Sequence, residues 1–220
     1  MSHGTDIDKA LSLIIHDMGA PLRAATYFSN RVRKAGESQD SGSLERDLDM
    51  LQQSIVQAQD VLDSVRGIRS ILFQQAKSVS FALDDIRLHL AFQFSGADIT
   101  FEVSDQTVTG CDHLINLAAK EVVRNALTHS DARNAHVKIG YKDGDLSIIV
   151  RDKGPGIDPA FADRATAPFQ VGNIEKKRNG SKGMGLYYAQ LAVEKLNGKL
   201  SWTQADNGFE VAITCPMPAV

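Results

Sequence analysis

The chain has 220 residues, of which 43% are hydrophobic, and a formal net charge of -3, so it can build one large domain or two small ones with apolar cores. The near-neutral charge, without a long basic run, excludes generic nucleic-acid binding. No apolar stretch approaches the roughly 20 residues that span a bilayer, and the N-terminus lacks the pattern of a signal peptide, so we expect a cytoplasmic protein.

The first third of the chain has the apolar pattern of two long helices. Apolar residues recur at steps of three and four from Ile7 to Val32 and again from Leu44 to Leu72. A polar turn at 36–43 joins the two, and Pro21 should kink the first. One hairpin cannot enclose two continuous apolar stripes, whereas two hairpins form a four-helix bundle. We therefore expect a homodimer through residues 5–76, with a bundle closed within one chain as the alternative.

His16 lies on the face of the first helix that the apolar stripe leaves free. It follows Ile14 by two residues, so at about 100° per residue it points away from the stripe and toward solvent. Its neighbour Asp17 can orient the imidazole ring, fix its tautomer and take up its proton, which makes His16 a candidate nucleophile. A lone exposed histidine usually has no role, so the interpretation depends on the motifs downstream.

From Ser78 the hydrophobic pattern changes to short strands alternating with helices. Strands are expected at 99–103, 135–141, 146–150, 199–203 and 209–214, and helices at 84–94, 112–129 and 183–196. This mixture indicates an α+β fold in which helices cover one face of a mixed sheet. The expected domains are 1–76 and 77–220, with a short junction at 74–78.

Three conspicuous residues of this second half are assigned to packing. Cys111 and Cys215 stand far apart in apolar surroundings, which indicates reduced core residues rather than a disulfide or a metal site. Trp202 falls on an expected strand and is interpreted as a core residue.

Two segments combine polar side chains with glycines. Glu121 and Asn125 are four residues apart and share one face of their helix, and their oxygen atoms suit Mg²⁺. Asp152 follows an expected strand and precedes Gly154 and Gly156, which let the backbone approach a flat ligand. Both segments therefore have the residue types of a ligand site.

A third segment, 180–186, leads into an apolar helix. Its backbone amides and the helix N-terminus predict a phosphate cradle, formed around Lys182, Gly183, Gly185 and Leu186. Each motif alone is weak evidence, because short motifs recur by chance. Their order and spacing within one domain favour a nucleotide-binding site.

In this order the motifs resemble those of the ATP-binding domain shared by sensor histidine kinases, gyrase, HSP90-type chaperones and MutL. Residues 1–76 resemble the dimerisation and phosphotransfer domain of histidine kinases, so the resemblance covers nearly the whole chain. It implies ATP and Mg²⁺ as ligands. By position it further implies that His16 accepts a phosphoryl group with help from Asp17, and that Asn125 binds the metal.

The resemblance also assigns the residues around the nucleotide. Asp152 resembles the aspartate that accepts a hydrogen bond from the adenine amino group, inside a first glycine box formed by Gly154 and Gly156. Phe169 resembles the phenylalanine box of the family.

The second glycine box and the lid come from the next stretch of chain. Gly183 and Gly185 resemble that box, and residues 170–182 resemble the mobile lid. The basic triplet at 176–178 either closes on phosphate charge or is a solvated loop. Glu121 corresponds to the glutamate that activates water in ATP-hydrolysing relatives, a role that the sequence leaves open.

Ala20 and Thr128 are among the positions that depart from the family pattern, as are Ser181 and Tyr187 at the second glycine box. Ala20 stands four residues after His16, where many relatives carry a threonine or asparagine that positions water. Alanine cannot hydrogen-bond water, so weak phosphatase activity toward the regulator is expected. Thr128 stands where a basic residue often neutralises phosphate, and Arg124, Lys182 or the lid triplet would have to replace that charge.

The sequence therefore predicts the core of a two-component histidine kinase that phosphorylates itself on His16 and then an aspartate of a response-regulator receiver domain. One alternative is a histidine phosphotransferase with a degenerate ATP site, which predicts no ATP affinity. Another is a switch ATPase or serine kinase of the same ATP-binding family, for which His16→Ala would change nothing. The input is expected from a separate sensor protein or from a sensor domain of a longer chain.

Overall fold

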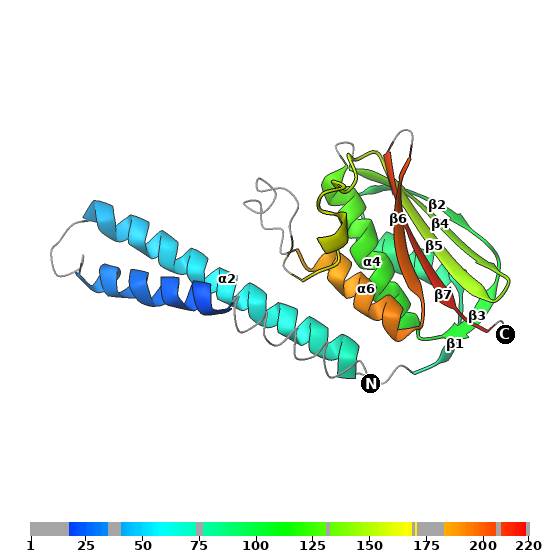
Figure 1. Ribbon diagram of the computed structural model, residues 1–220, viewed down its shortest axis with the longest axis horizontal. Helices are drawn as coiled ribbons and strands as arrows, with labels where there is room; N and C mark the ends of the chain where they lie inside the picture. Colours follow the sequence, from blue (N-terminus) through cyan, green and yellow to red (C-terminus); the bar gives the residue numbers. More distant parts are fainter. Residues whose placement is uncertain are drawn as a thin grey trace. The chain divides into compact units, whose positions relative to one another are not determined.

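The computed structural model describes residues 18–34, 41–73, 77–130, 133–168, 170, 183–205 and 208–218. Contacts divide the chain into two compact units, Met1–Arg69 and Ser70–Val220. The first is helical, and the second combines helices with a sheet (Figure 1). In the described ranges, no helix has both the length and the apolarity needed to cross a membrane.

The first unit is a helical hairpin. One helix covers 18–34, and its partner is α2, Ser41–Phe73, of 33 residues. Arg31 Nε lies 2.8 Å from Asp47 Oδ2 and so ties the two helices together, with the guanidinium 5.8 Å from the centre of the Tyr27 ring. The expected hairpin is confirmed. The kink at Pro21, which lies within the first helix, stays a prediction.

The second unit is built on a five-stranded mixed sheet in the order β2-β4-β5-β7-β6. Its strands are β2 Asp98–Val103, β4 Asn134–Lys142, β5 Asp145–Asp152, β6 Lys199–Ala205 and β7 Gly208–Pro216. The β2–β4 pair is parallel and the other pairs are antiparallel. Asp143 and Gly144 join β4 to β5 with φ of 56° and 95°, the positive values that suit a two-residue hairpin turn.

Three of the described helices cover one face of this sheet: α3 Leu83–Gln93, α4 Asp112–His129 and α6 Gly185–Lys195. Figure 1 shows α4 and α6 side by side against the sheet. Apolar side chains of α4, such as Ile115 and Val123, share one buried core with Val137 of β4 and Ile213 of β7. The fold is therefore α+β with helices on one face, as expected.

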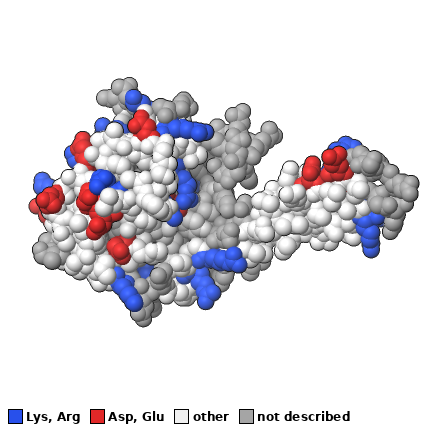
Figure 2. All heavy atoms as spheres, turned by 180° about the vertical axis from the view of Figure 1, so that it is seen from behind, with Lys and Arg blue, Asp and Glu red and all other residues white. Residues whose placement is uncertain are grey.

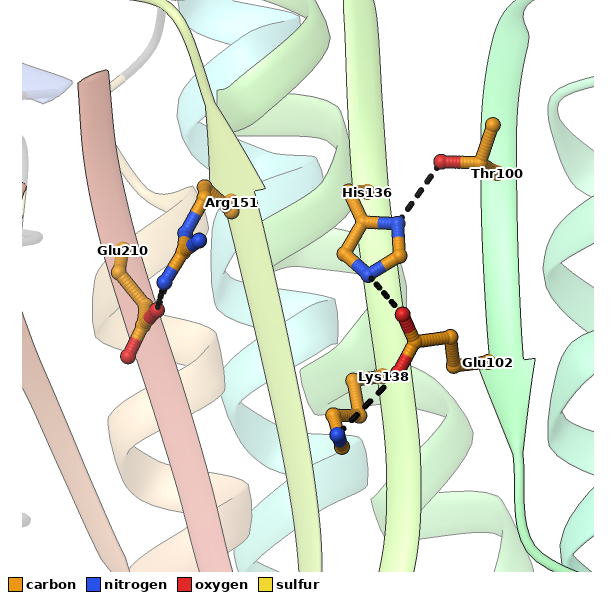
Figure 3. Close-up of polar contacts among 6 residues, drawn as sticks. All are labelled: Thr100, Glu102, His136, Lys138, Arg151 and Glu210. Carbon is orange, nitrogen blue, oxygen red and sulfur yellow. Dashed lines mark hydrogen bonds and ion pairs between the residues drawn. The ribbon is translucent and has the colours of Figure 1, made fainter. Parts of the chain in front are cut away.

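The other face of the sheet is polar. Glu102 pairs with His136 at 3.3 Å and with Lys138 at 3.1 Å, and Arg151 pairs with Glu210 at 2.6 Å. In Figure 3 these side chains lie on the near side of the strands, with the helices behind. Figure 2 likewise shows acidic and basic side chains interspersed over the second unit. Such exposed ion pairs contribute little to stability.

Three short elements had no signal in the sequence. β1, Val79–Ala82, pairs antiparallel with β3, Thr107–Gly110, and a 3-10 helix, η1, covers Ala162–Arg164. Elements of three or four residues are too short for a hydrophobic period to emerge.

The last turn of α2 belongs by its contacts to the second unit. Ile71 is 2% exposed and lies in the core cluster of that unit. The ammonium of Lys195, at the end of α6, donates hydrogen bonds to the carbonyls of Ile71 and Leu72 at 2.5 and 3.1 Å. The contacts therefore divide the chain after Arg69, ahead of the junction that composition indicates.

Candidate functional site

Asp152 ends β5 in the middle of the sheet and is 7% exposed. Its Oδ1 accepts a hydrogen bond from the backbone N–H of Gly154 at 2.6 Å. A Cβ atom on Gly154 would lie 2.8 Å from the carbonyl oxygen of His129, so the turn packs against the C-terminal end of α4 as only glycine allows. The turn thereby fixes the orientation of the carboxylate.

Gly156 continues this turn in a backbone conformation that favours glycine, with φ of 77°. A Cβ atom here would lie 2.5 Å from Gln204 Oε1 and 2.6 Å from Phe209 Cδ2. Neither side chain was predicted to lie near this turn. The only signal that could have found them is the sheet register, in which Phe209 of β7 stands opposite Asp152.

The carboxylate and carboxamide of α4 converge on the first residue of α6. A Cβ atom on Gly185 would lie 3.3 Å from both Asn125 Oδ1 and Glu121 Oε2. The helix N-terminus supplies N–H groups and the positive end of the helix dipole at the same place. The expected pairing of Glu121 with Asn125 is therefore present, and it faces the expected phosphate cradle.

Glu121 is an ionisable group in an enclosed position. Its side chain is 4% exposed and contacts Arg124 at 2.8 Å and Lys120 at 3.9 Å. Burial raises the pKa of the Glu121 carboxyl above its ordinary value, while the charges of Arg124 and Lys120 oppose this shift. A raised pKa in a polar cluster is typical of functional sites.

The ends of the expected lid lie against each other. A Cβ atom on Gly183 would collide with the backbone of Gln170, so these two described residues, on either side of 171–182, are in direct contact. Leu186, in the first turn of α6, packs against the core. The remaining predicted residues, namely His16, Asp17, Phe169, Lys182 and the lid over 171–182, lie outside the described residues.

A cavity of about 380 Å³ opens on a different side of the sheet. Its lining includes Thr100, His136, Arg151 and Asp152. Successive side chains of a strand point to opposite faces, so Arg151 points to the polar face, where Figure 3 shows it. The buried carboxylate of Asp152 points to the face covered by helices. Of the residues with nucleotide chemistry, Asp152 borders this cavity, whereas Glu121, Asn125 and Gly185 on the helix side are not among the residues that line it.

The helix-side residues fit a magnesium nucleotide. His129, the end of α4 beside Asp152, follows Asn125 by four residues, or about 6 Å at the helical rise, so α4 runs from the oxygen ligands to the Asp152 turn. Among the described residues, no three His, Cys, Asp or Glu side chains are placed to hold a metal ion. Mg²⁺ needs only one or two protein oxygens besides water and phosphate, and Glu121 with Asn125 supplies them.

Comparison with known proteins agrees with this chemistry. A family model described as "Histidine kinase-, DNA gyrase B-, and HSP90-like ATPase" matches residues 110–219. The sensor histidine kinase CpxA of Escherichia coli K12 is 23% identical over 225 residues, which cover 97% of this chain and 48% of CpxA. The sensor histidine kinase component HK1 of Mycobacterium tuberculosis is 33% identical over 130 residues, which cover 58% of this chain and 76% of that protein. The chain thus spans about half the length of CpxA.

Solved structures share the fold. Histidine kinase ThkA, crystallised in complex with the response regulator TrrA, has a TM-score of 0.65 at 15% identity, over 94% of this chain and 61% of that one. Full-length ShkA in complex with AMPPNP has a TM-score of 0.64 at 15% identity, over 80% and 39% of the two chains.

The family match covers half of the chain and includes α4, the Asp152 turn and α6. The chain therefore belongs to the histidine kinase-, DNA gyrase B- and HSP90-like ATPase family, as the catalytic core of a sensor histidine kinase of the two-component type.

Proposed function

We propose that this core phosphorylates itself on His16 with Mg-ATP and passes the phosphoryl group to an aspartate of a response-regulator receiver domain in the cytoplasm. One observation carries the proposal. Glu121 and Asn125 meet the N-terminus of α6 at Gly185, while the C-terminal residue of α4, His129, packs against the Asp152 turn. A single helix thus aligns the groups suited to phosphates with the group suited to a base.

Different residues bind the base, the phosphates and the cation of Mg-ATP. Asp152 accepts a hydrogen bond from the adenine amino group, and Gly154 and Gly156 let the base approach the backbone. The N–H groups of the α6 N-terminus hold the phosphates. Bound Mg-ATP supplies the γ-phosphoryl group and the cation that neutralises its charge. Glu121 and Asn125 provide the oxygen ligands of that cation.

Phe169, Lys182 and Leu186 complete the proposed nucleotide site. Phe169 directly precedes the lid segment in the sequence, and Lys182 is the last residue of that segment. We assign Lys182 to phosphate charge and Phe169 and Leu186 to apolar contacts that exclude water.

His16 is the proposed nucleophile. Its unprotonated ring nitrogen forms a bond to the γ-phosphorus, while the bond from that phosphorus to the bridging oxygen breaks and its electron pair leaves with ADP. Asp17 orients the ring and takes up the ring proton. Ala20, exposed in the helix over 18–34, lacks the hydrogen-bonding group that would position water, so phosphatase activity is weak.

We further propose that the hairpin forms a homodimer through residues 5–76. Leu48, Ile55 and Leu62 recur every seven residues along α2 and are 46%, 46% and 43% exposed. A seven-residue apolar repeat left exposed by one hairpin is the seam that a second hairpin covers in a four-helix bundle.

Labelling with γ-³²P-ATP tests the function. The wild type should acquire acid-labile label and transfer it to a receiver domain. His16→Gln should bind nucleotide normally yet remain unlabelled, whereas Asn125→Ala should lose labelling together with metal-dependent nucleotide binding. Label that persists in His16→Gln would favour a serine kinase or switch ATPase, and a wild type without ATP affinity would favour a phosphotransferase.

A further inference from the structure

We infer that Arg124 is a phosphate-neutralising cation of this site, in addition to the proposed Lys182, and that it exchanges partners, leaving the Glu121 carboxylate for the triphosphate when ATP binds. The inference rests on the proposed function and deepens it, because Arg124 supplies on α4 the charge that Thr128 does not provide.

The pair formed by Arg124 and Glu121 is unlike an ordinary surface pair of the same spacing. Arg87 and Asp84, also three residues apart, form a pair on α3 in which the Asp84 side chain is 52% exposed. The Glu121 side chain is 4% exposed, whereas that of Arg124 is 53% exposed. Arg124 therefore reaches a buried carboxylate from solvent, and its guanidinium can leave without disturbing buried atoms.

The guanidinium is already at the phosphate end of the site. Glu121 Oε2 lies 2.8 Å from Arg124 Nη1, and the same oxygen lies 3.3 Å from the Cβ position of Gly185. Arg124 thus stands beside the N-terminus of α6. A phosphate bound there would be within reach of a small rotation of the Arg124 side chain.

The neighbouring residues on α4 single out Arg124. Thr128 donates its hydroxyl to the Arg124 carbonyl at 2.7 Å and is uncharged. The two residues are four apart, so Arg124 presents its charge on the same helix face, one turn earlier. Lys120 reaches only the other oxygen of Glu121, at 3.9 Å. Among the described residues, Arg124 is the cation in closest contact with this carboxylate.

The hydrogen-bonding geometry of a guanidinium favours its transfer from the Glu121 carboxylate to a phosphate. A guanidinium donates two parallel hydrogen bonds to a phosphate, and such charge-assisted bonds are about twice as strong as neutral ones. Because Arg124 must give up Glu121 to make them, the buried carboxylate competes with ATP for the same side chain. Neutralising Glu121 should therefore release Arg124 and tighten triphosphate binding when no metal is present.

The first test compares Arg124→Gln with the wild type in the full chain, by calorimetric titration with ATP, ADP and adenosine in EDTA. The expected loss is about tenfold for ATP, smaller for ADP and absent for adenosine. Arg124→Lys should recover part of the ATP affinity. Arg87→Gln, which changes net charge equally at a surface pair, is the matched control and should bind all three ligands like the wild type.

The second test is a double-mutant cycle in the same buffer. Glu121→Gln should tighten ATP binding several-fold, and most of that gain should vanish in Glu121→Gln/Arg124→Gln. An equal loss for all three ligands in Arg124→Gln, no loss at all, or a fully additive cycle would overturn the exchange while leaving the kinase proposal intact. A wild type that binds no nucleotide would overturn both.

Discussion

At the residue scale, the site retains a buried carboxylate at a cost in stability. Because burial raises the pKa of Glu121 above its ordinary value of 4.5, the folded state binds the proton of this carboxyl more tightly than the unfolded chain does. Its contribution to stability is therefore complete below about pH 4.5 and is lost as pH rises through the raised pKa.

Glu121→Gln should accordingly raise the melting temperature at pH 7 to 8, and the gain should shrink as the pH falls toward 4.5. Thermal unfolding at several pH values measures this. Glu102→Gln is the matched control, because Lys138 lowers the pKa of that exposed carboxyl and its removal should give no such gain. A difference between Glu121→Gln and wild type that is independent of pH would contradict the account.

The two cysteines should not react with thiol reagents in the folded protein. Both Cys111 and Cys215 are buried and free, and burial raises the pKa of the Cys215 thiol to about 12, so little reactive thiolate forms at pH 8. Titration with a thiol reagent at pH 8 should modify neither cysteine in native protein and both after unfolding. Fast modification of Cys215 in native protein would show that the core around it opens.

Residue types alone predicted the polar groups of the proposed site but not all of the side chains around it. Glu121 with Asn125 was predictable from helical spacing, and Asp152 from its place before two glycines. Gln204 and Phe209 were not, because strand register brings them to Gly156. Sequence also left three candidates for the missing phosphate charge. Lys182 and the triplet at 176–178 lie outside the described residues, and the contact with Glu121 supports Arg124.

At the element scale, the last turn of α2 works as part of the second unit. Ile71→Ala removes a side chain that is 2% exposed and should destabilise this unit by about 2–5 kcal/mol, the usual cost of such a cavity. Trp202, the single tryptophan, lies on β6, so its fluorescence during urea unfolding reports this unit.

Leu62→Ala provides the comparison for Ile71→Ala. Leu62 is on the same helix but in the first unit and is 43% exposed. Its replacement should leave the Trp202 transition unchanged. Equal shifts of that transition in the two variants would mean that α2 unfolds as one piece with the second unit.

Helices and strands long enough to show a regular spacing of hydrophobic residues were predictable, whereas the shortest elements were not. The expected strands at 135–141 and 146–150 correspond to β4 and β5, each extended by one or two residues at its ends. β1 and β3 have four residues each. They form because they pair with each other although they lie far apart in the sequence, and not because of a local sequence pattern.

At the scale of the whole molecule, the spacing of apolar residues changes from long helical stripes to short runs typical of strands and helices. This change was enough to predict a helical hairpin followed by an α+β domain. Where the two units divide was less predictable. The composition changes at 74–78, yet Ile71 already packs in the core of the second unit, and such a contact leaves no trace in local composition.

Assembly should depend on the exposed repeat of α2. Light scattering after size exclusion should give twice the chain mass of 23.9 kDa, and Ile55→Asp combined with Leu62→Asp should give the single mass, because buried unpaired charges are costly. Phe92→Asp alters an equally apolar residue of α3, 79% exposed, and should remain dimeric. A monomeric wild type would contradict the bundle.

The central claim is that the nucleotide lies on the helix side of the sheet, along α4. Amide NMR of the chain labelled with ¹⁵N-glycine, recorded with and without Mg-AMPPNP, tests it most directly. The account predicts that Gly154, Gly156, Gly183 and Gly185 shift while Gly140, on β4 away from this site, does not. Shifts confined to Gly140, with these four glycines unmoved, would contradict it.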